Sequence, residues 1–86
     1  DIMANQTDFT IEQLRAFVAS YVTEPIDTIS DEDYLLDVGI DSITMMTIVE
    51  ELRQKGFPLT FIQLADNPTI KAWHALIKEY AADYGG

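Results

Sequence analysis

The sequence predicts an all-α fold: a bundle of three longer helices and one short helix, with a long loop between the first two helices. Apolar residues recur every three or four positions in several segments, and small polar residues stand where these segments begin. No segment alternates apolar and polar residues for long enough to indicate a strand. The length of 86 residues and the apolar fraction of 48% suit one compact domain.

The first helix is predicted over residues 11–22. Thr10 and Gln13 have the spacing of a capping box at its start, and Pro25 forbids its continuation. Its apolar residues fall within about 140° of a helical wheel, so one face should be buried. These residues are Ile11, Leu14, Phe17, Val18, Tyr21 and Val22.

The segment from Pro25 to Asp41 is polar, acidic and aperiodic. Within it, the Tyr-Leu-Leu run at residues 34–36 follows Ser30, a possible cap, and indicates one short turn. A loop of this length in a small domain is expected only where it is functional or pinned by such a turn.

The second helix is predicted from Ser42 to Lys55, with Gly56 as a left-handed cap and Phe57 as its apolar contact. On a helical wheel the core positions form one stripe. They are Met45, Ile48, Val49 and Leu52. Ile43 and Met46 lie outside that stripe, on the side of Glu50 and Arg53. These two residues are either singly exposed or covered by the preceding loop, or they form a partner-binding patch.

A short third helix is predicted over residues 60–65, where Thr60 and Gln63 repeat the capping spacing. A fourth helix should follow Asn67 and Pro68, a polar cap candidate and a proline near the first helical position, and run to about Ala82. Its apolar face comprises Ile70, Trp73, Leu76, Ile77, Tyr80 and Ala81. The predicted domain spans residues 10–82, preceded by a linker or cloning remnant (1–9) and followed by a flexible tail (83–86).

The charge balance disfavours several classes of partner. Five Lys and Arg residues stand against fifteen Asp and Glu residues, a net charge of -10, which repels nucleic acid and anionic lipid and favours basic partners. From Glu24 to Glu51 there are nine acids and no Lys or Arg. No apolar run is long enough to span a bilayer and no signal peptide is visible, so we expect a cytoplasmic, monomeric domain with no membrane or nucleic-acid contact.

The candidates for catalytic or metal-binding chemistry are weak. Ser42 would need a base, and His74, the only histidine, sits at the edge of an apolar helix face. The residues around Ser42 also lack the glycines of a nucleophile elbow. The acidic run at residues 31–33 is followed by leucines where a calcium loop needs a third ligand and a glycine. Neither catalytic residues nor a metal site are predicted.

Ser42 nevertheless has a notable position, at a helix start behind Gly39 and Asp41. Free backbone N–H groups and the helix dipole favour an anion there, so this serine is suited to carrying a phosphodiester. On these residues alone, the simpler interpretation is favoured, in which Ser42 is a plain helix-start residue with Asp41 as its cap.

The Asp-Ser-Ile run at residues 41–43, the four-helix plan and the acidic balance together resemble the carrier proteins of phosphopantetheine-dependent synthases. The resemblance covers about residues 10 to 80 and implies the four-helix carrier-protein bundle. It implies that Ser42, with Asp41 beside it, receives a 4'-phosphopantetheine arm from coenzyme A. The arm would supply the thiol that this cysteine-free chain lacks.

Two stretches resemble the aryl carrier domains of nonribosomal siderophore synthesis, which are often fused to an isochorismatase. Gly-Ile-Asp-Ser at residues 39–42 is similar to their G-[LI]-D-S motif. Asn-Pro-Thr-Ile-Lys-Ala-Trp at residues 67–73 is similar to their N-P-T-[IL]-x-x-W block, although His74 stands where relatives often have a second tryptophan. The resemblance implies a noncatalytic domain that is modified by a phosphopantetheinyl transferase, loaded with a hydroxybenzoate-type acid by an adenylating ligase, and unloaded by a condensation domain.

The resemblance also points to a partner-binding surface. Met46, Phe61 and Ala65 occupy the positions that a condensation domain reads in that family, and Ile43 lies next to the modified serine. Asp37, Asp41 and Glu50 are expected to steer partners electrostatically. Two alternatives stay open: an acyl or peptidyl carrier of fatty acid, polyketide or peptide synthesis, and an unmodified helical interaction module.

Overall fold

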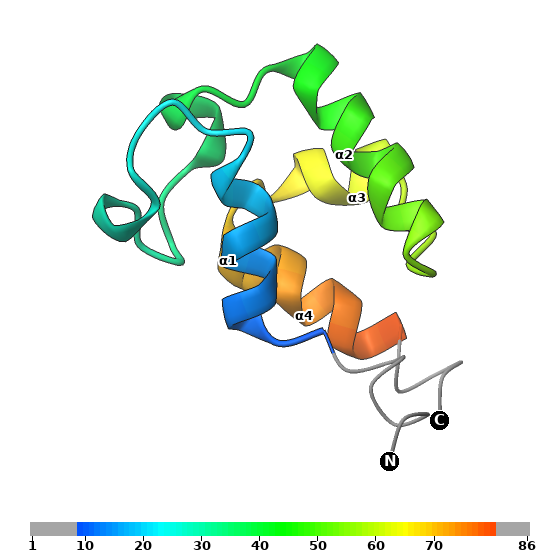
Figure 1. Cartoon of the computed structure of the whole chain (residues 1–86). Helices are drawn as coiled ribbons and strands as arrows, with labels where there is room; N and C mark the ends of the chain where they lie inside the picture. Colours follow the sequence, from blue (N-terminus) through cyan, green and yellow to red (C-terminus); the bar gives the residue numbers. More distant parts are fainter. Residues whose placement is uncertain (1–8, 81–86) are drawn as a thin grey trace.

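The computed structural model describes residues 9–80, and in this range the chain is helical and contains no strand. The helices are α1 (Ile11–Ala19), α2 (Ser42–Gln54), α3 (Phe61–Asp66) and α4 (Ile70–Tyr80), with single 3-10 turns η2 (Ile26–Thr28) and η3 (Leu35–Val38) in the loop between α1 and α2 (Figure 1). The predicted all-α bundle with a short third helix and a long first loop is therefore confirmed. No helix in the described range is long and apolar enough to cross a membrane.

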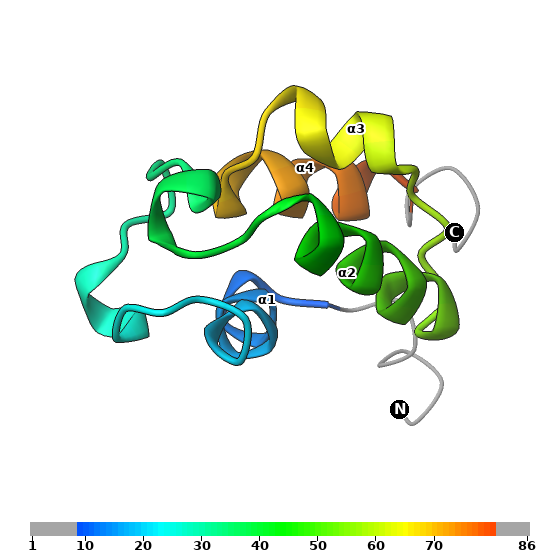
Figure 2. The ribbon, with the colours of Figure 1, turned by 90° about the horizontal axis from the view of Figure 1, so that it is seen from above.

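The helices pack in pairs. α1 lies mainly against α4, and α2 lies against α3. In the view from above, α1 is seen nearly end-on, α3 and α4 lie together, and the loop occupies one end of the molecule (Figure 2). The start of α2 emerges from that loop, so the position of the loop decides where Ser42 is presented.

The core contains apolar residues from every helix and from the loop. Fully or nearly fully buried are Leu14, Val18, Ile29, Leu35, Ile40, Met45, Ile48, Leu52, Phe57, Leu59, Leu64, Ile70, Trp73 and Ile77. The indole N–H of Trp73 donates to the carbonyl oxygen of Leu64 at 2.9 Å. This bond joins α4 to α3 and satisfies the polar atom of the largest core side chain.

α1 begins as predicted but ends three residues early. The Thr10 N–H donates to Gln13 Oε1 at 2.8 Å and the Gln13 N–H to Thr10 Oγ1 at 3.1 Å, which confirms the capping box. The predicted end at residue 22 is wrong, because the Tyr21 N–H bonds to the Val18 carbonyl at 2.8 Å and tightens the chain into a turn after Ala19. Tyr21 still packs against the core, so the apolar pattern outlasts the helix.

α2 ends at Gln54, one residue before the predicted end, and the predicted left-handed glycine follows its C-cap Lys55. Gly56 has a φ of 100°, its N–H donates to Arg53 at 3.0 Å, and the Phe57 N–H donates to Leu52 at 2.8 Å, which together form a Schellman motif. Phe57 is buried and stacks on Phe9 at 5.6 Å between ring centroids. It also meets Tyr80 edge-on at 6.3 Å.

The predicted N-terminal cap of α3 is confirmed, whereas the predicted cap of α4 is wrong. Thr60 and Gln63 form the predicted capping box of α3. The proposed Asn67 cap of α4 is wrong: the Ala72 N–H donates to Thr69 Oγ1 at 3.0 Å, so Thr69 is the cap, and Asn67 ends α3. Pro68 therefore lies before the cap and not inside the first turn. Residues 1–8 and 81–86, which include the predicted end of this helix, Ala81 and the tail, lie outside the described residues.

The loop contains the predicted short turn, η3, but Ser30 does not cap it. The hydroxyl of Ser30 accepts from the Glu32 N–H at 3.1 Å and closes a separate turn. The loop is held to the core by Ile29, Leu35 and Ile40, all buried, and the Leu35 N–H donates to the Pro68 carbonyl at 2.8 Å. The aperiodic segment is thus pinned by single apolar residues.

Candidate cofactor-attachment site

The chain approaches α2 through a position where only glycine avoids strain. Gly39 has a φ of 110°, and a Cβ atom there would lie 2.7 Å from Thr23 Cγ2. Thr23 is held in place because its N–H donates to the Val38 carbonyl at 2.9 Å. A side chain at Gly39 would meet both a strained backbone and a steric clash.

The next two residues set the start of the helix. Ile40 is buried, and its N–H donates to the Leu35 carbonyl at 3.2 Å, which closes η3. Asp41 then caps α2: its carboxylate accepts from the Thr44 N–H at 2.8 Å, as expected. This hydrogen bond, together with one from the Thr44 hydroxyl, lowers the pKa of Asp41.

Ser42 is the first residue of α2 and is exposed to solvent. Its place at the capped start of a thirteen-residue helix favours a negatively charged group on the hydroxyl. The site therefore fits a phosphodiester that is attached from outside, because the hydroxyl is within reach of a second protein and the anion would lie at the positive end of the helix.

The surroundings of Ser42 do not form a hydrolase site. His74 lies on α4 and is partly buried, and no hydrogen bond joins it to Ser42 among residues 9–80. The three acids at residues 31–33 are engaged elsewhere: Asp31 pairs with Arg15, Glu32 pairs with Lys71, and the Asp33 carboxylate accepts from the Ser30 N–H. In the same range no group of three or more His, Asp or Glu side chains could hold a metal ion.

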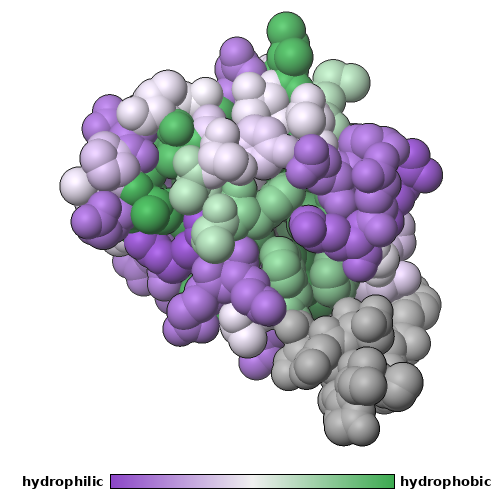
Figure 3. All heavy atoms as spheres, viewed as in Figure 1, coloured by the Kyte–Doolittle hydropathy of each residue, from purple (hydrophilic) through white to green (hydrophobic). Residues whose placement is uncertain are grey.

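The two apolar residues that the helical wheel placed outside the core are exposed. Ile43 is 77% and Met46 is 63% exposed, so the loop does not fold over them. Hydrophobic surface is visible where α2 begins, at the top of Figure 3, while a hydrophilic area covers the far part of that helix. Of the alternatives that the sequence left open, coverage of Ile43 and Met46 by the preceding loop is therefore excluded.

α3, which packs against α2, carries the other proposed contact residues. Phe61 is 38% exposed, and Ala65 is partly buried against the core. Between them Ile62 is 77% exposed, although the periodicity of the sequence gives no sign that it belongs to this surface. A six-residue helix is too short for a wheel to separate core from surface, so only its place beside Phe61 could have indicated it.

Glu50 is exposed, and its carboxylate forms an ion pair with Arg53. Its carboxylate accepts two hydrogen bonds from Arg53, at 2.8 and 2.9 Å, and one from Gln54 at 3.3 Å. The Arg53 contact is the main cause of the lowered pKa of Glu50. The charge that Glu50 presents to a partner is therefore offset within the same helix.

Comparison with known proteins assigns the sequence to a family. Residues 12–77 match the sequence profile of the phosphopantetheine attachment site. The chain is 42% identical over 69 residues to an isochorismatase of Bacillus subtilis, a match that covers 80% of this chain and 22% of that protein. It is 35% identical over 66 residues to the phenyloxazoline synthase MbtB of Mycolicibacterium paratuberculosis, covering 77% of this chain and 6% of that protein.

A shorter match, 43% identical over 47 residues, joins it to enterobactin synthase component B of Escherichia coli, over 55% of this chain and 16% of that protein. The chain thus spans at most 22% of the length of these three relatives. Proteins of the matched family are noncatalytic carriers with a covalent 4'-phosphopantetheine on a serine. Since the profile extends over most of the chain, from α1 to α4, the protein belongs to the phosphopantetheine attachment site family of carrier domains.

Proposed function

We propose that Ser42 bears 4'-phosphopantetheine and that the domain holds an aryl acid of the hydroxybenzoate type as a thioester in nonribosomal siderophore synthesis. The observation that carries the proposal is the exposed Ser42 hydroxyl at the capped start of α2, within the residues that match the family profile. The aryl assignment is supported by the relatives, which include an isochorismatase, phenyloxazoline and pyochelin synthetases and an enterobactin synthase component.

The residues around the serine serve its modification by a second enzyme. Ser42 Oγ forms a bond to the β-phosphorus of coenzyme A, the phosphoanhydride breaks, and adenosine 3',5'-bisphosphate leaves. The hydroxyl proton passes to a base of the transferase. Asp41 fixes the helix start, and the first turn of α2 stabilises the phosphodiester that results. Once attached, the arm supplies the thiol that carries the acyl group.

Three classes of partner act on the domain under this proposal: a basic phosphopantetheinyl transferase, an aryl-acid adenylating ligase and a condensation domain. Ile43 and Met46 beside Ser42, and Phe61 and Ala65 on α3, are proposed as their apolar contacts. Glu50 is proposed as a contact together with Arg53, as an ion pair. We place the reaction in the cytoplasm, where coenzyme A is available.

The groove along α4 does not favour a carrier of long alkyl chains. Such a carrier needs an enclosed apolar cavity between its helices. The described residues form a groove of ≈ 1000 Å³, but it is open and runs along α4. Its lining includes the charged residues Glu32, Lys71, Lys78 and Glu79. This groove would not shelter an alkyl chain from water.

The deciding experiment is modification in vitro. The apo protein is incubated with coenzyme A and a broad-specificity transferase, and the peptide containing Ser42 is weighed. We expect the added mass of one phosphopantetheine on that peptide and none on Ser42→Ala. An unmodified serine in the wild-type protein would overturn the proposal.

The cargo is tested on the modified protein. Loading is measured with a 2,3-dihydroxybenzoate-activating ligase and, separately, with fatty acyl and aminoacyl donors. Preferential thioester formation with the aryl acid supports the aryl carrier assignment. Preference for an acyl or aminoacyl donor would leave the carrier role intact and replace the cargo.

A further inference from the structure

The loop that presents Ser42 is anchored to α1 by one arginine. Arg15 Nη1 donates to Asp31 Oδ1 at 2.6 Å, and Arg15 Nη2 donates to the Ile26 carbonyl oxygen at 2.7 Å. The two acceptors lie five residues apart, on η2 and on the turn that follows. Because a guanidinium presents its donors in a rigid fork, this one side chain sets the separation of the two turns.

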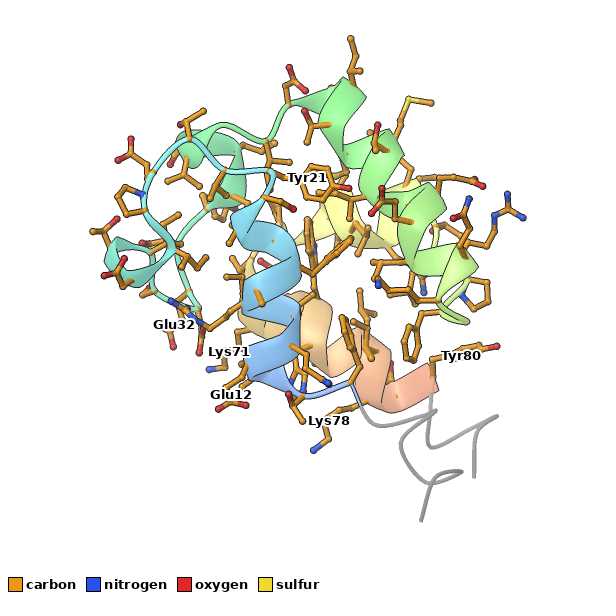
Figure 4. All side chains as sticks on the ribbon, in the orientation of Figure 1. Glu12, Tyr21, Glu32, Lys71, Lys78 and Tyr80 are labelled. Carbon is orange, nitrogen blue, oxygen red and sulfur yellow. The ribbon has the colours of Figure 1, made fainter. Side chains whose placement is uncertain are left out.

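Asp31 also joins the loop to α4. Its carbonyl oxygen accepts from the backbone N–H of Lys71 at 2.8 Å, a donor in the first turn of α4 that has no partner within the helix. The adjacent Glu32 carboxylate meets Lys71 Nζ at 3.4 Å, and these two side chains lie together in Figure 4. Asp31 is therefore the point at which α1, the loop and α4 meet.

From Asp31 the connection continues to Ser42 through short backbone steps. Leu35 is tied to the carbonyl of Pro68, Ile40 is tied to the carbonyl of Leu35, and Asp41 caps α2. These contacts leave few residues between Asp31 and the serine without a fixed partner. Asp31 and Leu35 are both hydrogen-bonded to the stretch where α4 begins, at Lys71 and Pro68, so loosening of Asp31 would loosen the segment from which η3 and α2 continue.

We propose that Arg15 and Asp31 are positioning residues for the modification of Ser42, a role that rests on the function proposed above. A partly exposed ion pair contributes little to the stability of a domain, and here the side chains are 25% and 40% exposed. The pair instead limits local opening of a loop that otherwise depends on a few buried residues. A transferase binds only molecules in which the serine is presented correctly, so loss of the pair raises the apparent KM in inverse proportion to the competent fraction that remains.

The proposal is tested by transferase kinetics on four apo proteins: wild type, Arg15→Met, Arg15→Lys and Asp31→Asn. Arg15→Met keeps the apolar stem and removes both donors, and we expect KM for the carrier to rise about twofold with kcat little changed, as for a competent fraction reduced to about a half. Arg15→Lys keeps one donor and should be intermediate. Asp31→Asn keeps the carbonyl bond to Lys71 and should also be intermediate.

A destabilised control separates positioning from stability. Ile77→Val removes a methylene from the core in the second half of α4, away from the loop, and should lower the melting temperature without changing KM. Amide hydrogen exchange at Leu35 and Lys71 reports on the loop whether or not Ser42 is modified. Faster exchange in Arg15→Met, together with the higher KM, supports the proposal.

An unchanged KM in Arg15→Met, or unchanged exchange at both amides, would overturn the positioning role. Failure of the function proposed above looks different. In that case the wild-type protein itself gains no mass at Ser42, while exchange still shows whether Arg15 holds the loop.

Discussion

Gly39 is the residue on which the path into α2 depends most directly. Gly39→Ala places a methyl group 2.7 Å from Thr23 Cγ2 on a backbone with a φ of 110°. We expect a loss of about 1 to 3 kcal/mol in the free energy of unfolding, measured in urea. Gly56→Ala is the matched control, since its φ is 100° but nothing lies within 4 Å of the added atom. Equal losses in the two variants would show that the contact with Thr23 costs nothing.

Asp41 links the helix cap to pH. Its pKa lies below the ordinary value of 3.8, so its contribution to stability is present above that pH and is lost as the pH falls through the lowered pKa. Asp41→Asn keeps a capping side chain without the charge. The wild type should melt at a higher temperature than Asp41→Asn at neutral pH, and the difference should narrow below pH 3.8. A difference that is constant across this range would contradict the assignment.

Individual residues also show what sequence reasoning can reach. Ser42, Ile43 and Met46 were placed by the helical wheel and the capping pattern, because both depend only on spacing along one helix. The role of Arg15 could not be predicted, since its partner Asp31 lies 16 residues away across an aperiodic loop. The burial of Ile40 was missed for the same reason.

At the scale of elements, two interactions hold the end of α1 against α2. Tyr21 is hydrogen-bonded to Glu51, and Lys55 Nζ lies 5.6 Å from the ring centroid of Phe17. Phe17 and Tyr21 pack edge to face at 5.4 Å, one turn apart. Figure 4 shows Tyr21 between the end of α1 and α2. The contacts of Tyr21 with Glu51 and of Lys55 with Phe17 hold α2, the helix that begins at Ser42, against the end of α1.

The contact predicts a loss of stability at alkaline pH. Burial, followed by the hydrogen bond and the negative charge of Glu51, raises the pKa of Tyr21 from 10.0 to about 12. Since the folded state favours the neutral phenol, the stabilisation is complete below pH 10.0 and is lost as the pH rises toward about 12. Tyr21→Phe should melt lower at pH 8 and lack this part of the alkaline loss. Tyr34→Phe, at an exposed tyrosine, should behave like the wild type; if Tyr21→Phe does so too, the hydrogen bond is not stabilising.

The helix boundaries differ in how well a sequence can define them. The capping boxes at Thr10 and Thr60 and the Gly56 cap were predictable, because each is a local pattern with one solution. The end of α1 was not, because Tyr21 keeps the apolar spacing after the backbone has already turned. The cap of α4 was ambiguous because Asn67 and Thr69 both offer a side-chain oxygen near a proline.

For the whole molecule, ion pairing changes how the charge of -10 is distributed. Three acids between residues 24 and 51 have basic partners: Asp31, Glu32 and Glu50. Asp37 and Asp41, which precede Ser42 by five residues and by one residue, form no ion pair with any described residue. The negative field near the serine therefore comes more from these two acids than from Glu50.

This distribution predicts the salt dependence of modification. The transferase kcat/KM should fall as sodium chloride rises from about 50 to about 300 mM, because screening weakens steering of a basic partner. Asp37→Asn should lower kcat/KM at low salt and flatten this dependence. The double variant Glu50→Gln/Arg53→Gln leaves the net charge unchanged and should keep the wild-type salt slope. If kcat/KM of the double variant depends less on salt than kcat/KM of Asp37→Asn does, the Glu50–Arg53 pair, and not Asp37, steers the transferase.

The aromatic cluster around Phe57 has a consequence for how the domain moves when tethered. Phe9 and Tyr80, near the two limits of the described chain, both touch Phe57, just beyond the end of α2. Ser42 stands at the other end of that helix, whose thirteen residues extend about 20 Å. Any neighbouring segments joined at residues 9 and 80 would be attached near the C-terminal end of α2, opposite Ser42. When the domain rotates about these attachments, Ser42 would move farther than residues near Phe57. Successive enzymes could then bind at Ser42 without contacting the attached segments.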